Sequence, residues 1–176
     1  MVDLQHHCCA RDGGTFTEDP ERWPEARQEA YFGQLEGEPL PNAAALAEAC
    51  RRRGIEVIYC VIEALTRDGR DRGLDHRLSN ILVPKESVEA KIVEAVAPAE
   101  DEIVLLKTAS DVLTDQCVES AVRDAADLGY RVTLVGDACC GSSPEAHAHT
   151  LTAMRGYARV AATAEILAEL QRPEGS

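Results

Sequence analysis

One cysteine occupies a position in which its thiol would be chemically activated. Cys117 comes directly before residues 118–128, in which the apolar residues recur at helical spacing. The free amides and partial positive charge of a helix N-terminus lower the pKa of a thiol there, and Thr114 or Asp115 can cap the helix. Because the thiolate is the nucleophilic form of cysteine, Cys117 is a candidate nucleophile. A buried, inert thiol is the alternative interpretation.

Charged residues follow the apolar runs that we predict to be strands. Ligands of open parallel sheets bind outside the carboxyl ends of the strands, so residues at these positions are candidate site residues. They are Asp3, Glu63, Lys107 and Asp137. Partial burial and a neighbouring carboxylate would set the proton affinity of Lys107 at the end of its strand. A surface lysine whose stem covers apolar surface is an equally good interpretation of that position.

Apolar, β-branched runs that alternate with helical patterns predict the elements that position these residues. The runs and the helical segments before them are residues 56–62 after 42–53, 103–106 after 88–96, and 131–135 after 118–128. This alternation is typical of βα units, and near-continuous apolar runs indicate strands covered on both faces. The sequence therefore predicts an α/β fold of three layers, α-β-α, around a mostly parallel sheet.

A final unit and two long connections complete the predicted organisation. Helix, strand and helix are expected at residues 150–157, 158–162 and 164–170. Segments 11–40 and 66–79 are rich in charge and in turn-forming residues, and we expect long loops there. Loops of this length in a compact α/β protein are usually functional.

Length and charge limit the classes of function. The 176 residues suit a single domain, 1–176, with an acidic tail at about 171–176. The net charge of 18 minus 31, or −13, argues against nucleic acids and anionic membranes as partners. No run approaches the ~20 apolar residues of a membrane span, and no signal peptide is recognisable, so we expect a cytoplasmic protein.

The seven cysteines are expected to be thiols rather than a disulfide framework. Residues 6–9 (His-His-Cys-Cys) and the pair 139–140 (Cys-Cys) suggest soft-metal ligands at first sight. Neither has the Cys-x-x-Cys spacing, and adjacent residues of an extended chain point to opposite sides. We therefore expect no metal and no cofactor.

Residues 113–125, with the sequence Leu-Thr-Asp-Gln-Cys-Val-Glu-Ser-Ala-Val-Arg-Asp-Ala, form the most specific motif of the chain. The motif resembles the nucleophile motif of isochorismatase-like cysteine hydrolases, which include nicotinamidases, N-carbamoylsarcosine amidases and ureidoacrylate amidohydrolases. Segments 2–5, 105–108 and 135–138 and residue His147 agree with the family in the same order. The resemblance therefore covers nearly the whole chain.

The resemblance implies a catalytic triad of Asp3, Lys107 and Cys117. In such enzymes the aspartate takes the thiol proton, the lysine steadies the charged pair, and the thiolate attacks the carbonyl carbon of a small amide or ureido compound. The family also has a cis peptide before the motif, here Val112-Leu113, which would direct the amides of Leu113 and Cys117 at the oxyanion. A homo-oligomer is the further expectation.

Residues 63–75 resemble a subgroup feature of these hydrolases, placed in the loop after the second strand. Glu63 and Arg70 are the candidate substrate-binding residues of this segment, since a guanidinium can hold a carboxylate or ureido oxygen through two hydrogen bonds. The alternative is a solvated loop that is cross-linked by its own Asp and Arg pairs.

Two features depart from the family pattern. Asp3 is preceded by only two residues, so the strand that should carry it is almost absent. Lys107 and Cys117 are separated by nine residues, whereas a parallel crossover needs about a dozen or more before the strand that it delivers. We expect that a helix and a central strand, roughly 25 residues in the family, are missing after residue 110 and leave the central sheet incomplete.

This shortening leaves several interpretations open. The chain is a truncated or incorrectly spliced version, an incomplete sequence, or a genuinely shortened protein that completes its sheet in another way. We expect weak or no amidase activity from it and activity once the segment is restored. A non-catalytic remnant that associates through exposed sheet edges is one alternative. Vinyl-ether hydrolysis of isochorismate is another, but members with that activity can lack the catalytic cysteine, so Cys117 favours amides.

Overall fold

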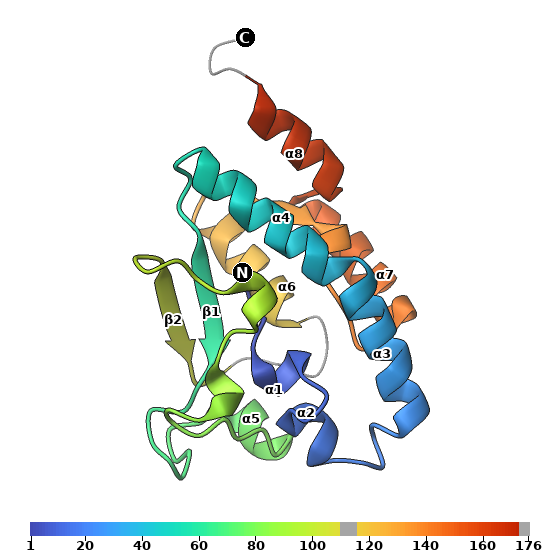
Figure 1. Cartoon of the computed structure of the whole chain (residues 1–176), viewed down its shortest axis with the longest axis vertical. Coiled ribbons are helices and arrows are strands. Elements are labelled where there is room, and N and C mark those ends of the chain that lie inside the picture. The colour runs from blue at the N-terminus through green and yellow to red at the C-terminus, as the bar shows by residue number, and fades with distance from the viewer. Residues whose placement is uncertain (110–115, 173–176) are drawn as a thin grey trace.

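The computed structural model describes residues 1–109 and 116–172. Its strands form two parallel pairs, β1 (Ile58–Ile62) with β2 (Ile103–Lys107) and β3 (Thr133–Val135) with β4 (Arg159–Ala161). Within these described ranges no strand joins one pair to the other. The predicted α/β class with parallel strands is therefore confirmed (Figure 1).

The segment that carries Asp3 is reduced to a single parallel bridge between Val2 and Cys60 of β1. The backbone N–H of Asp3 donates to Cys60 O at 2.9 Å, and that of Cys60 donates to Met1 O at 2.8 Å. Asp3 itself has a φ of 56°, in the left-handed region that Asp tolerates better than most residues. The extended chain thus ends at Asp3 and turns there into the first helix.

Eight helices surround the strands in the described part of the chain. They are α1 (His6–Cys9), α2 (Gly14–Thr17), α3 (Glu25–Gly37), α4 (Pro39–Arg52), α5 (Leu74–Leu78), α6 (Gln116–Asp127), α7 (Pro144–Ala153) and α8 (Thr163–Gln171). Four 3₁₀ turns complete the order: η1 (Val88–Ala90), η2 (Glu94–Val96), η3 (Gly136–Ala138) and η4 (Met154–Gly156). Helix α4 runs from the end of α3 to the loop before β1 and contacts α3 and α8 (Figure 1). No helix among the described residues is long and apolar enough to cross a membrane.

The prediction of a loop over residues 11–40 is wrong, because an aromatic cluster orders this segment into helices α2 and α3. Phe16 contacts Trp23, Tyr31 and Phe32, with ring centroids 4.8 to 5.3 Å apart. Phe16, Trp23, Phe32 and Leu35 are all buried. Burial of so much aromatic surface outweighs the loop-forming composition of the segment. Segment 66–79 was likewise predicted to be a loop, and it contains the short helix α5.

The predicted helix over residues 88–96 is also wrong. Two short turns, η1 and η2, occupy its ends, and the chain between them is extended. Ile92 forms an antiparallel bridge with Gln5, His6 N donates to Lys91 O, and Val93 N donates to Leu4 O. Adjacent β-branched residues favour the extended form, and pairing with the N-terminal segment stabilises it. The predicted helix at 150–157 begins earlier, at Pro144, and ends in η4.

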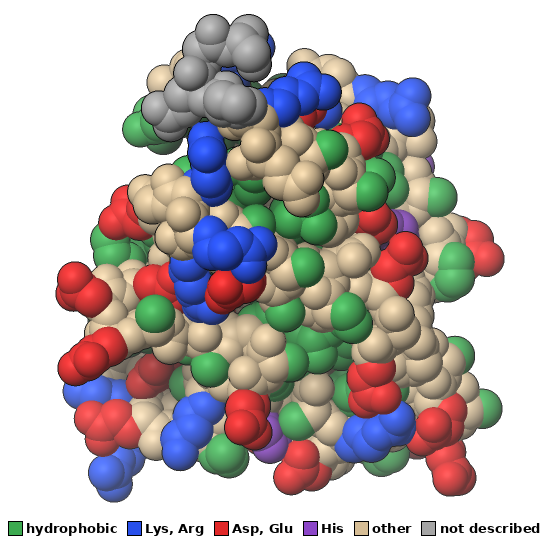
Figure 2. All heavy atoms as spheres, turned by 45° about the horizontal axis from the view of Figure 1, so that its top comes forward, with side chains coloured by type: hydrophobic (Ala, Val, Ile, Leu, Met, Phe, Trp, Pro, Cys, Tyr) green, Lys and Arg blue, Asp and Glu red, His purple; other side chains and the backbone are tan. Residues whose placement is uncertain are grey.

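The surface mixes both signs of charge. On the face shown in Figure 2, acidic and basic side chains are interspersed, and apolar side chains show between them. No broad basic surface covers this face, in agreement with the acidic composition. The longest run of consecutive exposed apolar residues in the described ranges is on β2.

Candidate active site

Three residues that are distant in the sequence meet through polar contacts. The Nζ of Lys107 lies 2.9 Å from Asp3 Oδ1 and 3.0 Å from Asp3 Oδ2. The same ammonium lies 3.1 Å from Cys117 Sγ. Lysine, aspartate and cysteine therefore form one contiguous group, with the ammonium between the carboxylate and the sulfur.

The ends of three elements position this group. Lys107 is the last residue of β2 and pairs in register with Ile62 of β1. The bridge between Val2 and β1 places Asp3 on the other side of β1, and Cys117 lies in the first turn of α6. The carboxyl ends of parallel strands share one edge of a sheet, which is why Asp3 and Lys107 lie close together.

Burial controls the protonation of the cysteine. Cys117 is only 9% exposed, and this burial, followed by the negative charge of Asp3, raises the pKa of the thiol to about 12. The positive charge of Lys107 acts in the opposite direction but is the weaker effect. The expectation that the helix start lowers this pKa is therefore wrong, because desolvation of the charged form outweighs it. The resting group contains a neutral thiol.

The lysine is held in its charged form. Burial is the largest single influence on the pKa of Lys107 and lowers it. The negative charge of Asp3, the charge that Cys117 carries once it is ionised, and the hydrogen bonds to both together raise the pKa of Lys107 further than burial lowers it. The ammonium is thus a permanent positive charge between two groups that can become negative.

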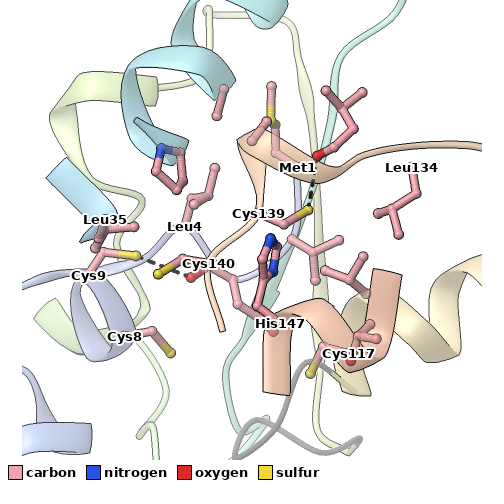
Figure 3. A pocket seen from close by; sticks show the side chains of 18 of the residues that line it. Met1, Leu4, Cys8, Cys9, Leu35, Cys117, Leu134, Cys139, Cys140 and His147 are labelled. Carbon is pink, nitrogen blue, oxygen red and sulfur yellow. Dashed lines mark hydrogen bonds between the residues drawn. The ribbon is translucent and has the colours of Figure 1, made fainter. Parts of the chain in front are cut away.

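A cavity of about 310 Å³ opens beside Asp3 and Cys117. It lies between the N-terminal segment and β3, where the two strand pairs are separate, and α3, α4 and α7 complete its wall (Figure 3). Its lining is mainly aliphatic, with the polar or polarisable side chains of Cys8, Cys9, Tyr31, Cys139, Cys140, His147 and Thr150. A space of this size holds a small molecule of a few to about ten heavy atoms.

The two predicted substrate-binding residues, Glu63 and Arg70, are not among the described residues that line this cavity. Glu63 Oε1 accepts the backbone N–H of Glu86 at 2.7 Å. The side chain of Arg70 is 73% exposed and pairs with Asp68 at 3.3 Å, as in the alternative of a loop cross-linked by its own charges. A role for these two residues in substrate binding stays a prediction. The predicted cis peptide, Val112-Leu113, lies outside the described residues.

His147 is a cavity residue that the sequence did not single out for the site. Its ring rises from α7 into the cavity, on the side of Cys139 and Cys140 (Figure 3). The available signal was its agreement with the family pattern after segment 135–138. Asp137 itself is not a cavity residue: its Oδ1 accepts the N–H and the hydroxyl of Thr163, both at 2.8 Å.

The two groups of sulfur and imidazole residues have other partners. Residues 6–9 are helical rather than extended, and the buried His7 contacts Glu89 Oε2 through Nδ1 at 2.8 Å. Cys9 Sγ lies 3.7 Å from Asp3 O, and Cys139 Sγ lies 3.4 Å from Val135 O. In the part of the chain that the structure describes, no three His, Cys, Asp or Glu side chains are arranged to hold a metal ion.

Comparisons with known proteins agree with the predicted fold. A sequence model of the isochorismatase domain matches residues 112–166. No protein of curated function matches the chain by sequence.

Solved structures match over nearly the whole chain. A cysteine hydrolase from Pseudomonas syringae pv. phaseolicola superposes with a TM-score of 0.77 at 18% identity, over 97% of this chain and 90% of that one. An isochorismatase family protein from Burkholderia thailandensis gives 0.71 at 20%, over 97% and 93%. A nicotinamidase from Bacillus subtilis gives 0.63 at 16%, over 91% and 96%. The predicted resemblance is therefore confirmed: the chain has the fold of the isochorismatase-like cysteine hydrolases, and residues 112–166 match the isochorismatase domain in sequence.

Proposed function

We propose that the chain is a cysteine-dependent hydrolase that cleaves a C–N bond in a small amide or ureido compound. The observation that carries the proposal is the contact of Lys107 Nζ with both Asp3, at 2.9 Å, and Cys117 Sγ, at 3.1 Å. An activated nucleophile needs a base and a charge-stabilising group within hydrogen-bond reach, and this group supplies both. The adjoining cavity supplies space for a small substrate.

In the proposed reaction, Asp3 takes the proton of the Cys117 thiol as the sulfur attacks the carbonyl carbon. The C–N bond of the tetrahedral intermediate then breaks, and the proton held by Asp3 goes to the leaving nitrogen, which departs as ammonia from a primary amide. Water attacks the thioester that remains, releases the acid and returns a proton to the sulfur. The ammonium of Lys107 stabilises whichever neighbour is negative.

The raised pKa of Cys117 fits this sequence of steps. Because the thiol is neutral at rest, a thiolate forms only as Asp3 accepts the proton, with a substrate carbonyl in place. A persistent thiolate would instead be open to oxidants and other electrophiles. Proton transfer within the group therefore couples nucleophile formation to the presence of substrate.

The test is release of ammonia from a panel of small primary amides and ureido compounds by the purified chain. Cys117→Ala should abolish turnover, whereas Cys50→Ala should not, since Cys50 is a thiol on α4 away from the cavity lining. Turnover that survives in Cys117→Ala would contradict the assignment of the nucleophile.

The vinyl-ether hydrolysis of isochorismate is less well supported. Isochorismate is a dicarboxylate, and no Lys or Arg side chain is among the described residues that line the cavity. Two buried negative charges without a cation to pair with them would be costly. The presence of Cys117 beside Asp3 and Lys107 also supports an amide rather than a vinyl ether as substrate.

We further propose that the chain forms a homo-oligomer through β2. This strand pairs only with β1 in the described chain, and Ile103, Val104, Leu105 and Leu106 are 42%, 39%, 51% and 49% exposed. A free, apolar edge strand is a site at which an identical strand pairs. The same edge supports the alternative hypothesis, in which the chain has no catalytic activity and associates with full-length subunits. Turnover that is lost in Cys117→Ala would distinguish the hydrolase from this alternative.

Two further expectations belong to this proposal. All seven cysteines are free thiols, which supports a reducing compartment, the cytoplasm, as the place of action. The expected site of the missing helix and strand lies at residues 110–115, outside the described residues. That a chain with this segment restored is the more active form therefore stays a prediction.

A further inference from the structure

The wall of the Cys117 cavity limits the charge of its ligand. Aliphatic side chains such as Val118 and Leu134 form most of the surface. Among the described residues of the lining, Asp3 carries the sole carboxylate and no Lys or Arg side chain is present. The amino group of Met1 is bound to Ile58 O at 2.7 Å. The carboxylate of Asp3 is already paired with Lys107, and none of the described lining residues is a Lys or Arg that could pair with an anion. Burial of a charged ligand would therefore be costly, so the cavity favours an uncharged molecule.

His147 lies on the face of α7 that lines this cavity. His147, Thr150 and Leu151 stand at positions i, i+3 and i+4, which share one face of a helix, and all three line the cavity. Leu151 packs against the core cluster that also includes Val118, the neighbour of Cys117 in α6. His147 is one helical turn before Leu151 on this face of α7. Figure 3 shows its ring projecting into this space.

The imidazole of His147 is available to a ligand. Neither ring nitrogen forms a hydrogen bond to any residue in the described ranges, whereas the hydroxyl of Tyr31 donates to Cys8 O at 3.1 Å. The helix beneath the ring is fixed: His147 N donates to Ser143 O at 3.0 Å, and Ser143 Oγ caps α7 by accepting from Ala146 N at 3.2 Å. A neutral imidazole offers one donor and one acceptor from this rigid support.

We propose that His147 determines the specificity of the Cys117 site by forming a hydrogen bond to a polar atom at the far end of the substrate. The substrate class is then a small, uncharged amide with a compact apolar body and one hydrogen-bonding atom remote from the scissile bond. This inference deepens the proposed hydrolase function and depends on it for the reaction, but the binding of the remote atom is measurable without turnover.

The kinetic test compares amides of the same shape. Benzamide is the apolar reference, and nicotinamide and isonicotinamide each replace one ring CH with a nitrogen that accepts a hydrogen bond. The wild-type chain should favour at least one of the two nitrogen-containing amides over benzamide by about tenfold in kcat/KM, the value of one neutral hydrogen bond. Succinamate, which carries a carboxylate, should be a poor substrate.

Variants of two histidines on the same helix separate specificity from stability. His147→Leu should abolish the preference by lowering the kcat/KM of the preferred nitrogen-containing amide about tenfold more than that of benzamide. His147→Gln should restore part of the preference, because an amide keeps a donor and an acceptor. His149→Leu is the matched control, because His149 is exposed on α7 and does not line the cavity. The control should keep the wild-type preference. An unchanged preference in His147→Leu, or equal losses on all three amides, would overturn the inference.

A binding measurement keeps the inference testable if the chain hydrolyses none of these amides. With ¹⁵N-labelled histidine, the preferred nitrogen-containing amide should shift the ring resonances of His147 and leave those of His149 in place, whereas benzamide should leave both unchanged. These shifts without ammonia release would support the site and contradict the hydrolase. Ammonia release with no response of His147 would support the hydrolase and contradict the specificity role.

Discussion

Lys107 and Cys117 are in contact, with Nζ 3.1 Å from Sγ, although Lys107 ends a strand and Cys117 lies in the first turn of a helix. The same lysine holds Asp3, which comes from the start of the chain. A positive charge that contacts both a carboxylate and a buried thiol sets the protonation of the whole group. Substitution of Asp3 and substitution of Lys107 should therefore shift the pKa of the Cys117 thiol in opposite directions.

Substitution of the two charged partners should change the reactivity of Cys117 in opposite directions. Asp3→Asn removes a negative charge that raises the thiol pKa, so the thiolate fraction and the rate of alkylation by iodoacetamide at about pH 8 should rise. Lys107→Met removes a positive charge that lowers this pKa, so alkylation should slow. Mass spectrometry of the Cys117 peptide measures both rates, and amide turnover should be lost in both variants.

The wild-type alkylation rate should also continue to rise above pH 9, because the pKa of the thiol is raised to about 12. Glu48→Gln, which removes an exposed carboxylate on α4, is the control and should leave the rate unchanged. If both charge variants accelerated alkylation, or both slowed it, the electrostatic description of the group would be incorrect.

Glu102→Gln should lower stability at neutral pH but not in acid. Two hydrogen bonds of 2.8 Å from Arg51 lower the pKa of Glu102 to about 2. A carboxylate with a depressed pKa contributes stability above its unfolded pKa of about 4.5, and the contribution is lost as the pH falls toward 2. Urea unfolding should show a loss of about 1 kcal/mol at neutral pH that disappears near pH 2.

The exposed pair of Glu48 and Arg52 provides the comparison for this measurement. Its atoms are 3.1 Å apart, but both side chains are mostly exposed. Glu48→Gln should therefore change the unfolding free energy by less than about 0.5 kcal/mol at any pH. A pH-independent effect of Glu102→Gln would argue that packing and not charge is responsible.

Phe32→Ala should destabilise the aromatic cluster that orders α3. Phe32 is fully buried and contacts the rings of Phe16 and Tyr31. Truncation of a buried phenylalanine costs about 4 kcal/mol through lost burial and the cavity left behind. Chemical denaturation measures this loss.

A substitution at Gly33, the next residue of α3, should change stability in the opposite direction. Gly33 has no atom within 4 Å of a Cβ added to it, so Gly33→Ala should stabilise the chain by up to about 1 kcal/mol through helix propensity. Equal stabilities for the Phe32 and Gly33 variants would show that α3 does not pack as described.

Leu105→Glu should reduce the mass of the proposed oligomer. Leu105 lies in the middle of the exposed strand β2, where a charge opposes pairing between identical edges. Light scattering coupled to size exclusion should show a shift toward monomer. Leu128→Glu changes a still more exposed leucine beyond the end of α6 and should leave the mass unchanged. A wild-type chain that is already monomeric would exclude β2 as the interface.

Local patterns predicted the elements whose contacts are local. The amphipathic stripe of Val118 to Leu128 marks α6, and the apolar runs mark β1 and β2 to within two residues of the observed bounds. The meeting of Asp3, Lys107 and Cys117 followed from their positions at element ends and from the resemblance of the motif. These predictions needed no knowledge of distant contacts.

The features that the sequence did not predict depend on distant contacts. Helix α3 forms because Phe32 and Leu35 join a cluster with Phe16, and residues around Ile92 are extended because they pair with the N-terminal segment. The direction of the Cys117 pKa shift was mistaken for a similar reason. The helix start is visible in the sequence, whereas the burial that outweighs it is produced by the fold.

The most direct test of the hydrolase proposal is the detection of a covalent acyl-enzyme. An activated small acyl substrate, such as a p-nitrophenyl ester, is mixed with the chain, the reaction is quenched in acid, and the adduct is located by mass spectrometry of the digested peptides. The proposal predicts an acyl group on Cys117 that disappears on further incubation and is absent from Cys117→Ala. Hydrolysis at the same rate by Cys117→Ala, with no adduct on Cys117 in the wild-type chain, would contradict it.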